Sequence, residues 1–230
     1  MPAYIRTLTV FYDAEISSRE IPFFRGAVLK CLGDKADVLY HNHTGDNTFR
    51  YSYPLIQYKR LNGKAAITCV EEGVDLVGQI LSNLYGPLTL GNRETECKVE
   101  DVKADKTPIE ISETVSDYQL SHWLPLNARN YALYQEADSL VERIRILERV
   151  LTGNILSFLK GVGIYLEEQL RVSIADIDGT QVVTYKQVKL MSFDIRFRAN
   201  ISLPSYVGIG KNASIGNGVI TRISSQKMSE

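Results

Sequence analysis

The order of strand-like and helix-like patterns in the first hundred residues constrains the fold most. Strands are predicted where aromatic and β-branched residues gather, and helices where apolar side chains recur every three or four positions. The predicted segments are a strand at 4–12, a helix from 22 to 32, strands at 49–60 and 65–70, a helix over 74–84 and a strand ending by 102. Asn62-Gly63 is typical of the tight turn of a hairpin. This β-α-β-β-α-β order predicts a ferredoxin-like domain over residues 1–102.

The second half, residues 103–230, repeats this order in a less regular form. A polar, acidic stretch at 101–114 is interpreted as a linker or edge hairpin, and 115–126 as an extended segment. An amphipathic helix follows, in which Gly153 is expected to end or bend the helix. A turn is predicted at 176–179 and strands at 181–189, 190–201 and 219–223. The fold class is therefore α+β, with two tandem ferredoxin-like (RRM-like) domains, the second degenerate; element order alone supports the duplication.

Residues 207–219 form a glycine-rich loop that reads VGIGKNASIGNGV. Glycine lets a backbone turn sharply and brings main-chain N–H groups close to a ligand, so the loop suits a phosphate backbone. A dinucleotide-binding motif does not fit, because Ala213 stands at the third glycine position. A Walker loop does not fit either, since Ser205 and Asn212 replace its first glycine and its Ser/Thr. A hairpin or bulged connection without a ligand remains the alternative.

The net charge of −1 hides an uneven distribution of charge along the chain. Residues 180–230 carry seven basic and two acidic side chains, so the glycine-rich loop lies in a basic segment. Phosphate contacts depend on nearby Lys and Arg rather than on total charge. The segment therefore fits a selective polyanion binder, although a solvated basic face gives the same pattern.

The cysteines and the hydropathy of the chain indicate the cellular compartment in which the protein is expected. Cys31, Cys69 and Cys97 are far apart and show no C-x-x-C spacing, which favours reduced thiols over a disulfide framework or a zinc site. The N-terminus has no signal-peptide pattern, and no apolar run approaches the roughly 18 residues of a membrane span. We expect a soluble, cytoplasmic protein that does not bind membranes.

Residues 193–218, FDIRFRANISLPSYVGIGKNASIGNG, resemble the C-terminal glycine-rich signature of the CRISPR-associated repeat-processing endoribonucleases. These proteins belong to the RAMP superfamily and consist of two ferredoxin-like domains. Shorter similarities lie at 24–27 (FRGA), 40–43 (YHNH) and 53–59 (YPLIQYK). The family commonly has an aromatic residue in the middle of the second Gly-x-Gly, where this chain has Asn217.

The resemblance implies metal-independent cleavage of CRISPR precursor RNA, with 2′,3′-cyclic phosphate and 5′-hydroxyl ends and no cofactor. Such chemistry requires a base for the 2′-hydroxyl, an acid for the leaving oxygen and positive charge at the phosphorane. His41 and His43 stand where the family places its catalytic histidine, and histidine titrates near neutrality. Lys59 is a candidate for charge stabilisation and Tyr51 for proton transfer or positioning. On an extended strand one face is shared by Tyr51, Tyr53, Leu55, Gln57 and Lys59.

The expected RNA-binding residues lie in and beside the glycine-rich loop: Arg196, Arg198, Gly208, Gly210, Lys211, Ser214, Gly216, Gly218 and Arg222. Each candidate has an ordinary alternative: the histidines could belong to a surface turn, Lys59 to a solvated strand face, and His122 is expected to be structural or to contact RNA. CRISPR repeat RNA is the expected partner, with other CRISPR effector subunits as further candidates and a monomer or homodimer as the assembly. The alternative functions are a non-catalytic RAMP-type subunit that binds guide RNA and a ferredoxin-like protein with a small anion in the glycine loop.

Overall fold

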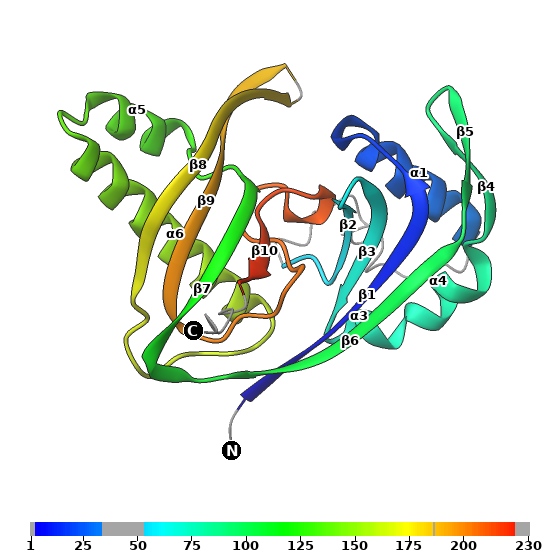
Figure 1. Ribbon diagram of the computed structural model, residues 1–230, viewed down its shortest axis with the longest axis horizontal. Coiled ribbons are helices and arrows are strands. Elements are labelled where there is room, and N and C mark those ends of the chain that lie inside the picture. The colour runs from blue at the N-terminus through cyan, green and yellow to red at the C-terminus, as the bar shows by residue number, and fades with distance from the viewer. Residues whose placement is uncertain (1–2, 34–52, 186, 224–230) are drawn as a thin grey trace, which may run out of the picture. The chain divides into compact units, whose positions relative to one another are not determined.

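The structure is a computed structural model that describes residues 3–33, 53–185 and 187–223. The chain forms two compact units, shown in Figure 1. The N-terminal unit comprises residues 4–107 together with 213–216, and the C-terminal unit comprises 1–3, 108–212 and 217–230. Four residues of the glycine-rich loop thus belong to the unit that is remote from them in sequence.

The N-terminal unit contains a four-stranded sheet in the order β2-β3-β1-β6, which is the ferredoxin-like order 4-1-3-2. Its α1 and α4 lie on one face of the sheet (Figure 1), where Phe24 of α1 contacts the rings of Tyr12 and Tyr58 edge to face. The elements are β1 (Ala3–Glu15), η1 (Ser18–Glu20), α1 (Ile21–Leu32), β2 (Ile56–Leu61), β3 (Lys64–Val70), α3 (Glu72–Asp75), α4 (Val77–Asn83), β4 (Gly86–Leu90), β5 (Arg93–Cys97) and β6 (Val99–Ile109).

Local sequence explains most of these boundaries. Pro22 lies in the first turn of α1, where its missing N–H is not needed, and Gly33, with φ of 52°, follows the last turn. Asn62 and Gly63 both have positive φ, as a two-residue hairpin turn between β2 and β3 requires. The predicted ferredoxin-like arrangement is confirmed.

Three details differ from the sequence-based expectation. Residues 53–55 of the predicted second strand are not strand, and β2 begins at Ile56; residues 49–52 of the predicted range lie outside the described residues. The predicted helix over 74–84 consists of two short helices, α3 and α4. The extended segment after Gly86 contains an additional hairpin, β4 and β5, before the last strand of the sheet.

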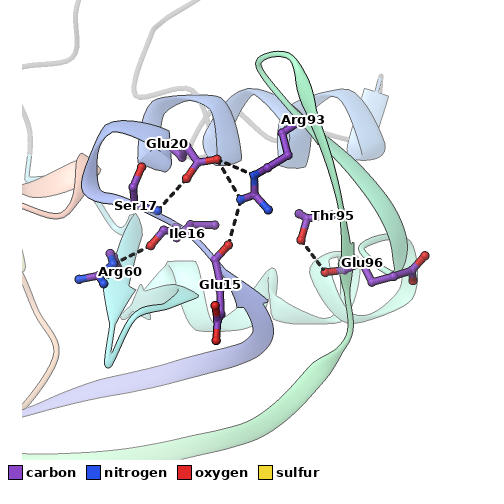
Figure 2. A network of polar contacts seen from close by, with 8 residues as sticks. All are labelled: Glu15, Ile16, Ser17, Glu20, Arg60, Arg93, Thr95 and Glu96. Carbon is purple, nitrogen blue, oxygen red and sulfur yellow. Dashed lines mark hydrogen bonds and ion pairs between the residues drawn. The ribbon is translucent and has the colours of Figure 1, made fainter.

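A network of polar contacts holds the β4–β5 hairpin to the start of α1 (Figure 2). The guanidinium group of Arg93 in β5 forms an ion pair with Glu20 at 2.9 Å and donates to the backbone oxygen of Glu15 at 3.0 Å. The other carboxylate oxygen of Glu20 accepts from the backbone N–H of Ser17, and Arg60 of β2 donates to Ile16 O. Gly91 at the hairpin tip lies near Phe23, since a Cβ on Gly91 would stand 3.6 Å from the phenyl ring.

The C-terminal unit contains a second four-stranded sheet in the order β10-β7-β9-β8, again 4-1-3-2. Helix α6 lies over one face of this sheet (Figure 1) and contributes buried residues to the core of the unit. The rings of Tyr118 and Phe197 stack with their centroids 5.2 Å apart. Where the second helix of a ferredoxin-like unit would stand, residues 202–218 contain only the single 3₁₀ turn η3 (Ala213–Ile215). The elements are β7 (Ile111–Trp123), α5 (Ala128–Glu136), α6 (Leu140–Gly161), β8 (Val172–Tyr185), β9 (Val188–Ile201) and β10 (Val219–Arg222).

The predicted boundaries in this unit need four corrections. Gly153 neither ends nor bends α6, because the helix continues to Gly161. The predicted turn at 176–179 lies inside β8, where the register with β9 shifts between Ile177 and Gly179. Residues 101–114 are strand rather than linker over most of their length, and α5 was not expected. The degenerate character of the second ferredoxin-like domain is confirmed by its missing helix.

Within the described ranges, none of the helices has both the length and the apolar character needed to cross a bilayer.

Candidate functional site

Lys59 lies on the face of the N-terminal sheet that α1 and α4 do not cover. Along β2, Ile56 and Tyr58 point into the helix-covered core, so alternation directs Gln57 and Lys59 to the opposite face. Both are fully buried. A solvated strand lysine, the ordinary alternative for this position, is therefore wrong.

The sheet face that carries Lys59 is polar although it is shielded from water. Thr68 of β3 stands opposite Gln57 and next to Thr9 of β1, and the two threonine hydroxyls lie 3.2 Å apart. Ala66 stands opposite Lys59, and its small side chain leaves room for the lysine stem. Buried polar groups normally have hydrogen-bond partners, so this face depends on its internal network.

Gln57 links Lys59 to the segment before β2. Its Oε1 accepts from Lys59 Nζ at 2.7 Å, and its Nε2 donates to Tyr53 Oη at 2.6 Å and to Pro54 O at 2.9 Å. A backbone carbonyl only accepts and an ammonium only donates, which fixes the orientation of the amide. The side-chain amide thus bridges a tyrosine and a lysine.

Burial changes the acid–base properties of this network. Desolvation lowers the pKa of Lys59 to about 7, because the charged amine loses its hydration. No carboxylate within the described residues contributes to this shift. Desolvation also raises the pKa of Tyr53, against a smaller opposite effect of the hydrogen bond from Gln57. Near neutral pH the phenol keeps its proton, while the lysine amine can either accept or release one.

The other predicted catalytic residues lie outside the described residues. These are His41, His43 and Tyr51, all within the undescribed range 34–52. Their roles stay predictions, and Lys59 is the member of the predicted set whose surroundings are described.

Residues Ala213–Gly216 of the glycine-rich loop pack against β2 and α1. Because β2 is the end strand of its sheet, this turn covers an edge that would otherwise be open. A Cβ on Gly216, which has φ of 84°, would lie 2.7 Å from Ile21 Cδ1 and 3.7 Å from Lys59 Cα. The absence of a side chain at Gly216 lets the loop lie directly on the backbone of the lysine.

The other glycines of the loop also lie in tight places. A Cβ on Gly218 would lie 2.0 Å from Ile209 O, and one on Gly210 would lie 2.6 Å from Asn154 Oδ1. The Gly218 N–H donates to His122 O, and its own oxygen accepts from Ile209 N–H. Gly208 forms an isolated antiparallel bridge to Val219. Close packing is a sufficient reason for glycine at 210, 216 and 218, and RNA contacts by these residues stay a prediction.

The two arginines on the exposed face of β9 are already paired. Arg196 forms ion pairs with Asp176 and Asp178 of β8, and Arg198 with Asp117 of β7 at 2.9 Å. The hydrogen bond to Asp178, followed by that to Asp176, raises the pKa of Arg196. These three aspartates lie outside residues 180–230, so the fold offsets part of the positive charge counted along the sequence.

The remaining predicted RNA-binding side chains differ in their surroundings. Lys211 is exposed, and none of the ion pairs formed within the described ranges involves it. Arg222 is exposed and donates to Ser116 Oγ at 3.3 Å, while Ser214 is partly buried in η3. Lys211 is therefore the candidate best placed to meet a phosphate without first breaking an ion pair.

His122 occupies a strained position at the end of β7. Its φ of 53° is uncommon for a residue other than glycine, and Asp194 holds the conformation by accepting its backbone N–H at 2.7 Å. The imidazole Nδ1 lies 3.7 Å from the same carboxylate oxygen. These contacts give the backbone of His122 a structural role, and contact with RNA, the other expectation, stays a prediction.

The sequence reasoning missed Gln57 and Tyr53 as partners of Lys59. Alternation along the strand did place Gln57 and Lys59 on one face, and that part is confirmed. Tyr53 precedes β2 and reaches Gln57 from an irregular segment, which strand periodicity does not describe. The signal available in the sequence was a glutamine two residues before a lysine on a predicted strand, and it does not reveal that both side chains are buried.

Two sheets of order 4-1-3-2, with a glycine-rich loop between the last two strands of the second, define a tandem ferredoxin-like protein. The Cas6b N-terminal domain model matches residues 3–108 and the Cas6b C-terminal domain model matches residues 110–223. The chain belongs to the Cas6b family.

Individual relatives agree with this assignment. An uncharacterized protein of Methanocaldococcus jannaschii is 35% identical over 114 residues, which are 49% of this chain and 76% of the relative. A crystal structure of Cas6b is similar with a TM-score of 0.86 and 28% identity, over 96% of this chain and 100% of that one. A crystal structure of the CRISPR RNA processing endoribonuclease Cas6b gives a TM-score of 0.74 and 25% identity over the same shares.

Proposed function

We propose that this protein is an endoribonuclease that cleaves CRISPR precursor RNA within its repeats. The observation that carries the proposal is the match of both Cas6b domain models together with the similarity, over 96% of the chain, to a CRISPR RNA processing endoribonuclease. The fold alone would not assign an activity. The match is supported by a buried, near-neutral lysine, a type of group that clusters at functional sites.

The proposed reaction needs no metal. The ribose 2′-hydroxyl attacks the adjacent phosphorus, the bond to the 5′-oxygen of the next nucleotide breaks, and a 2′,3′-cyclic phosphate and a 5′-hydroxyl result. The 2′-hydroxyl proton goes to a base, and the leaving oxygen receives a proton from an acid. His41 and His43 are together proposed to supply the base and the acid, without assignment of either role to one of them, and Tyr51 is proposed to act in proton transfer or positioning. Lys59 is proposed to provide positive charge, which requires that the groups covering it give the phosphate access.

The C-terminal unit is proposed to bind the RNA through the glycine-rich loop. Lys211 is exposed for a phosphate contact, whereas Arg196 and Arg198 would have to exchange their aspartates for phosphates. Such an exchange replaces one ion pair by another, so its net contribution to affinity is smaller than that of Lys211. Gly208, Gly210, Ser214, Gly216, Gly218 and Arg222 complete the proposed RNA-binding set.

Cleavage of a labelled repeat RNA in excess EDTA tests the proposal. We expect a cut with a 2′,3′-cyclic phosphate end, and no cut when a 2′-deoxy nucleotide precedes the scissile phosphate. His41→Ala combined with His43→Ala should abolish cleavage and leave RNA affinity largely unchanged. Binding without cleavage by the wild-type protein would instead support a non-catalytic RAMP-type subunit that binds guide RNA.

A further inference from the structure

The Lys59 amine has a hydrogen-bond partner that does not carry charge. We propose that Gln57 is a positioning residue, whose amide holds the Lys59 amine in one place for RNA cleavage and leaves that amine free to change its protonation state. This inference rests on the proposed function, because it gives Lys59 a part in the cleavage step. Gln57 itself acts through Lys59 and does not contact RNA in this proposal.

The amide of Gln57 is held at both ends. Tyr53 Oη and Pro54 O fix its nitrogen, so Oε1 can point only toward Nζ of Lys59. The side chains of Gln57 and Lys59 are both fully buried, which removes the water that would otherwise solvate and disorder a lysine amine. A flexible four-carbon side chain is thereby confined by one directed contact.

Replacing this amide by a carboxylate would change what the lysine can do. An opposite charge within hydrogen-bond distance favours the ammonium form by about 1 to 3 pKa units. Among the described residues, the groups on neighbouring elements that share the face of Lys59 or lie against its strand do not titrate: Ala66 and Thr68 on β3, Thr9 and Phe11 on β1 and the turn Ala213–Ile215. Tyr53, reached through Gln57, keeps its proton because burial raises its pKa. Among the described side chains, Gln57 therefore controls how strongly the protonated form of Lys59 is stabilised.

Two substitutions separate positioning from simple packing. Gln57→Glu should raise the pKa of Lys59 by about 1 to 3 units, and Gln57→Met, which removes the acceptor, should lower it. The pKa is read from the ¹³Cε and ¹⁵Nζ signals of labelled lysine over pH 5 to 11, with Lys59→Met identifying the signal. Cleavage of repeat RNA is measured over the same range.

For cleavage we expect the limb of the pH profile that Lys59 controls to move with its pKa in both variants. We also expect Gln57→Met, which loses the acceptor, to lower kcat at pH 7 by about 100-fold, as for a misplaced catalytic group, with KM for RNA unchanged. Thr68→Val is the matched control: it removes a buried polar group opposite Gln57 from the same face and should leave the pH profile unchanged.

The outcomes distinguish this inference from the proposed function. A wild-type protein that cuts, with folded Gln57 variants that keep the wild-type pKa of Lys59 and the wild-type pH profile, overturns the inference alone. A wild-type protein that does not cut overturns the proposed function, and the lysine titration then still decides whether Gln57 controls the amine. If Gln57→Glu does not fold, Gln57→Met tests the same inference, because it is expected to shift the pKa of Lys59 in the opposite direction.

Discussion

The buried amine of Lys59 makes the stability of the N-terminal unit depend on pH. Its pKa is about 7 in the fold and 10.5 when the chain is unfolded. Between these values the unfolded chain binds more protons, so the free energy of unfolding rises with pH across this window. The destabilisation caused by burial of the amine is fully present below pH 7 and has vanished above pH 10.5.

The magnitude follows from the two pKa values. At 1.36 kcal/mol per unit, burial of the amine destabilises the fold by about 4 kcal/mol at pH 7 and by about 2 kcal/mol at pH 9. Lys59→Met has a similar shape and no charge, so it removes this contribution. It leaves Gln57 Oε1 without its donor, which costs about 1 to 3 kcal/mol at any pH. We expect the variant to be more stable than wild type at pH 7, and its advantage to shrink by about 2 kcal/mol by pH 9.

Urea unfolding of both proteins under reducing conditions, at half-unit steps from pH 6.5 to 9.5, measures this difference. The thiols of Cys69 and Cys97, whose pKa values burial raises to about 12, destabilise both proteins equally at high pH and cancel in the comparison. Curves that stay parallel between pH 7 and pH 9 would show that the Lys59 amine is not desolvated and would refute the reasoning. They would also remove the physical support for a near-neutral lysine in catalysis.

Three further outcomes are expected. Gly218→Ala should lower the stability by several kcal/mol, since its Cβ would lie 2.0 Å from a backbone oxygen at a positive φ; equal thermal melts of variant and wild type would contradict this. Gly153→Ala should raise the stability by about 0.5–1 kcal/mol, because it lies in a helix with nothing near its Cβ; a lower melting temperature would count against it. Lys211→Ala should lower the slope of log affinity for repeat RNA against log salt by about 0.7, and Arg196→Ala by less, as its guanidinium is already paired; a larger effect of Arg196→Ala would show that its ion pairs open on binding.

Local signals in the sequence predicted the N-terminal unit well. Asn62-Gly63 specifies the β2–β3 turn, and the apolar spacing after Pro22 specifies α1, because each signal acts over a few residues. Strand alternation also placed Gln57 and Lys59 on one face of β2. The burial of that face could not be read from sequence, since polar residues such as Thr9 and Thr68 predict exposure.

The errors arise where tertiary packing overrides local preference. Asp-Gly at 178–179 is a strong turn signal, yet the ion pair of Asp178 with Arg196 and a shift of register keep it inside a strand. Gly153 weakens a helix by only about 1 kcal/mol, and the buried stripe of α6 on both sides of it outweighs that. The acidic partners of Arg196 and Arg198 come from other strands, so a charge count along one segment overestimates the basic surface.

The membership of Ala213–Gly216 in the N-terminal unit has a consequence for biosynthesis. A ribosome makes residues 4–107 first, but the turn that covers the end strand of their sheet emerges more than a hundred residues later. Until then the β2 edge of the nascent unit is uncovered, and Gly216 is not yet in place beside the Lys59 backbone. The edge is accessible to chaperones and to other chains during this time. Maturation of the lysine site is therefore coupled to the synthesis of residues 213–216, and a product truncated before them would lack the turn beside its candidate catalytic amine.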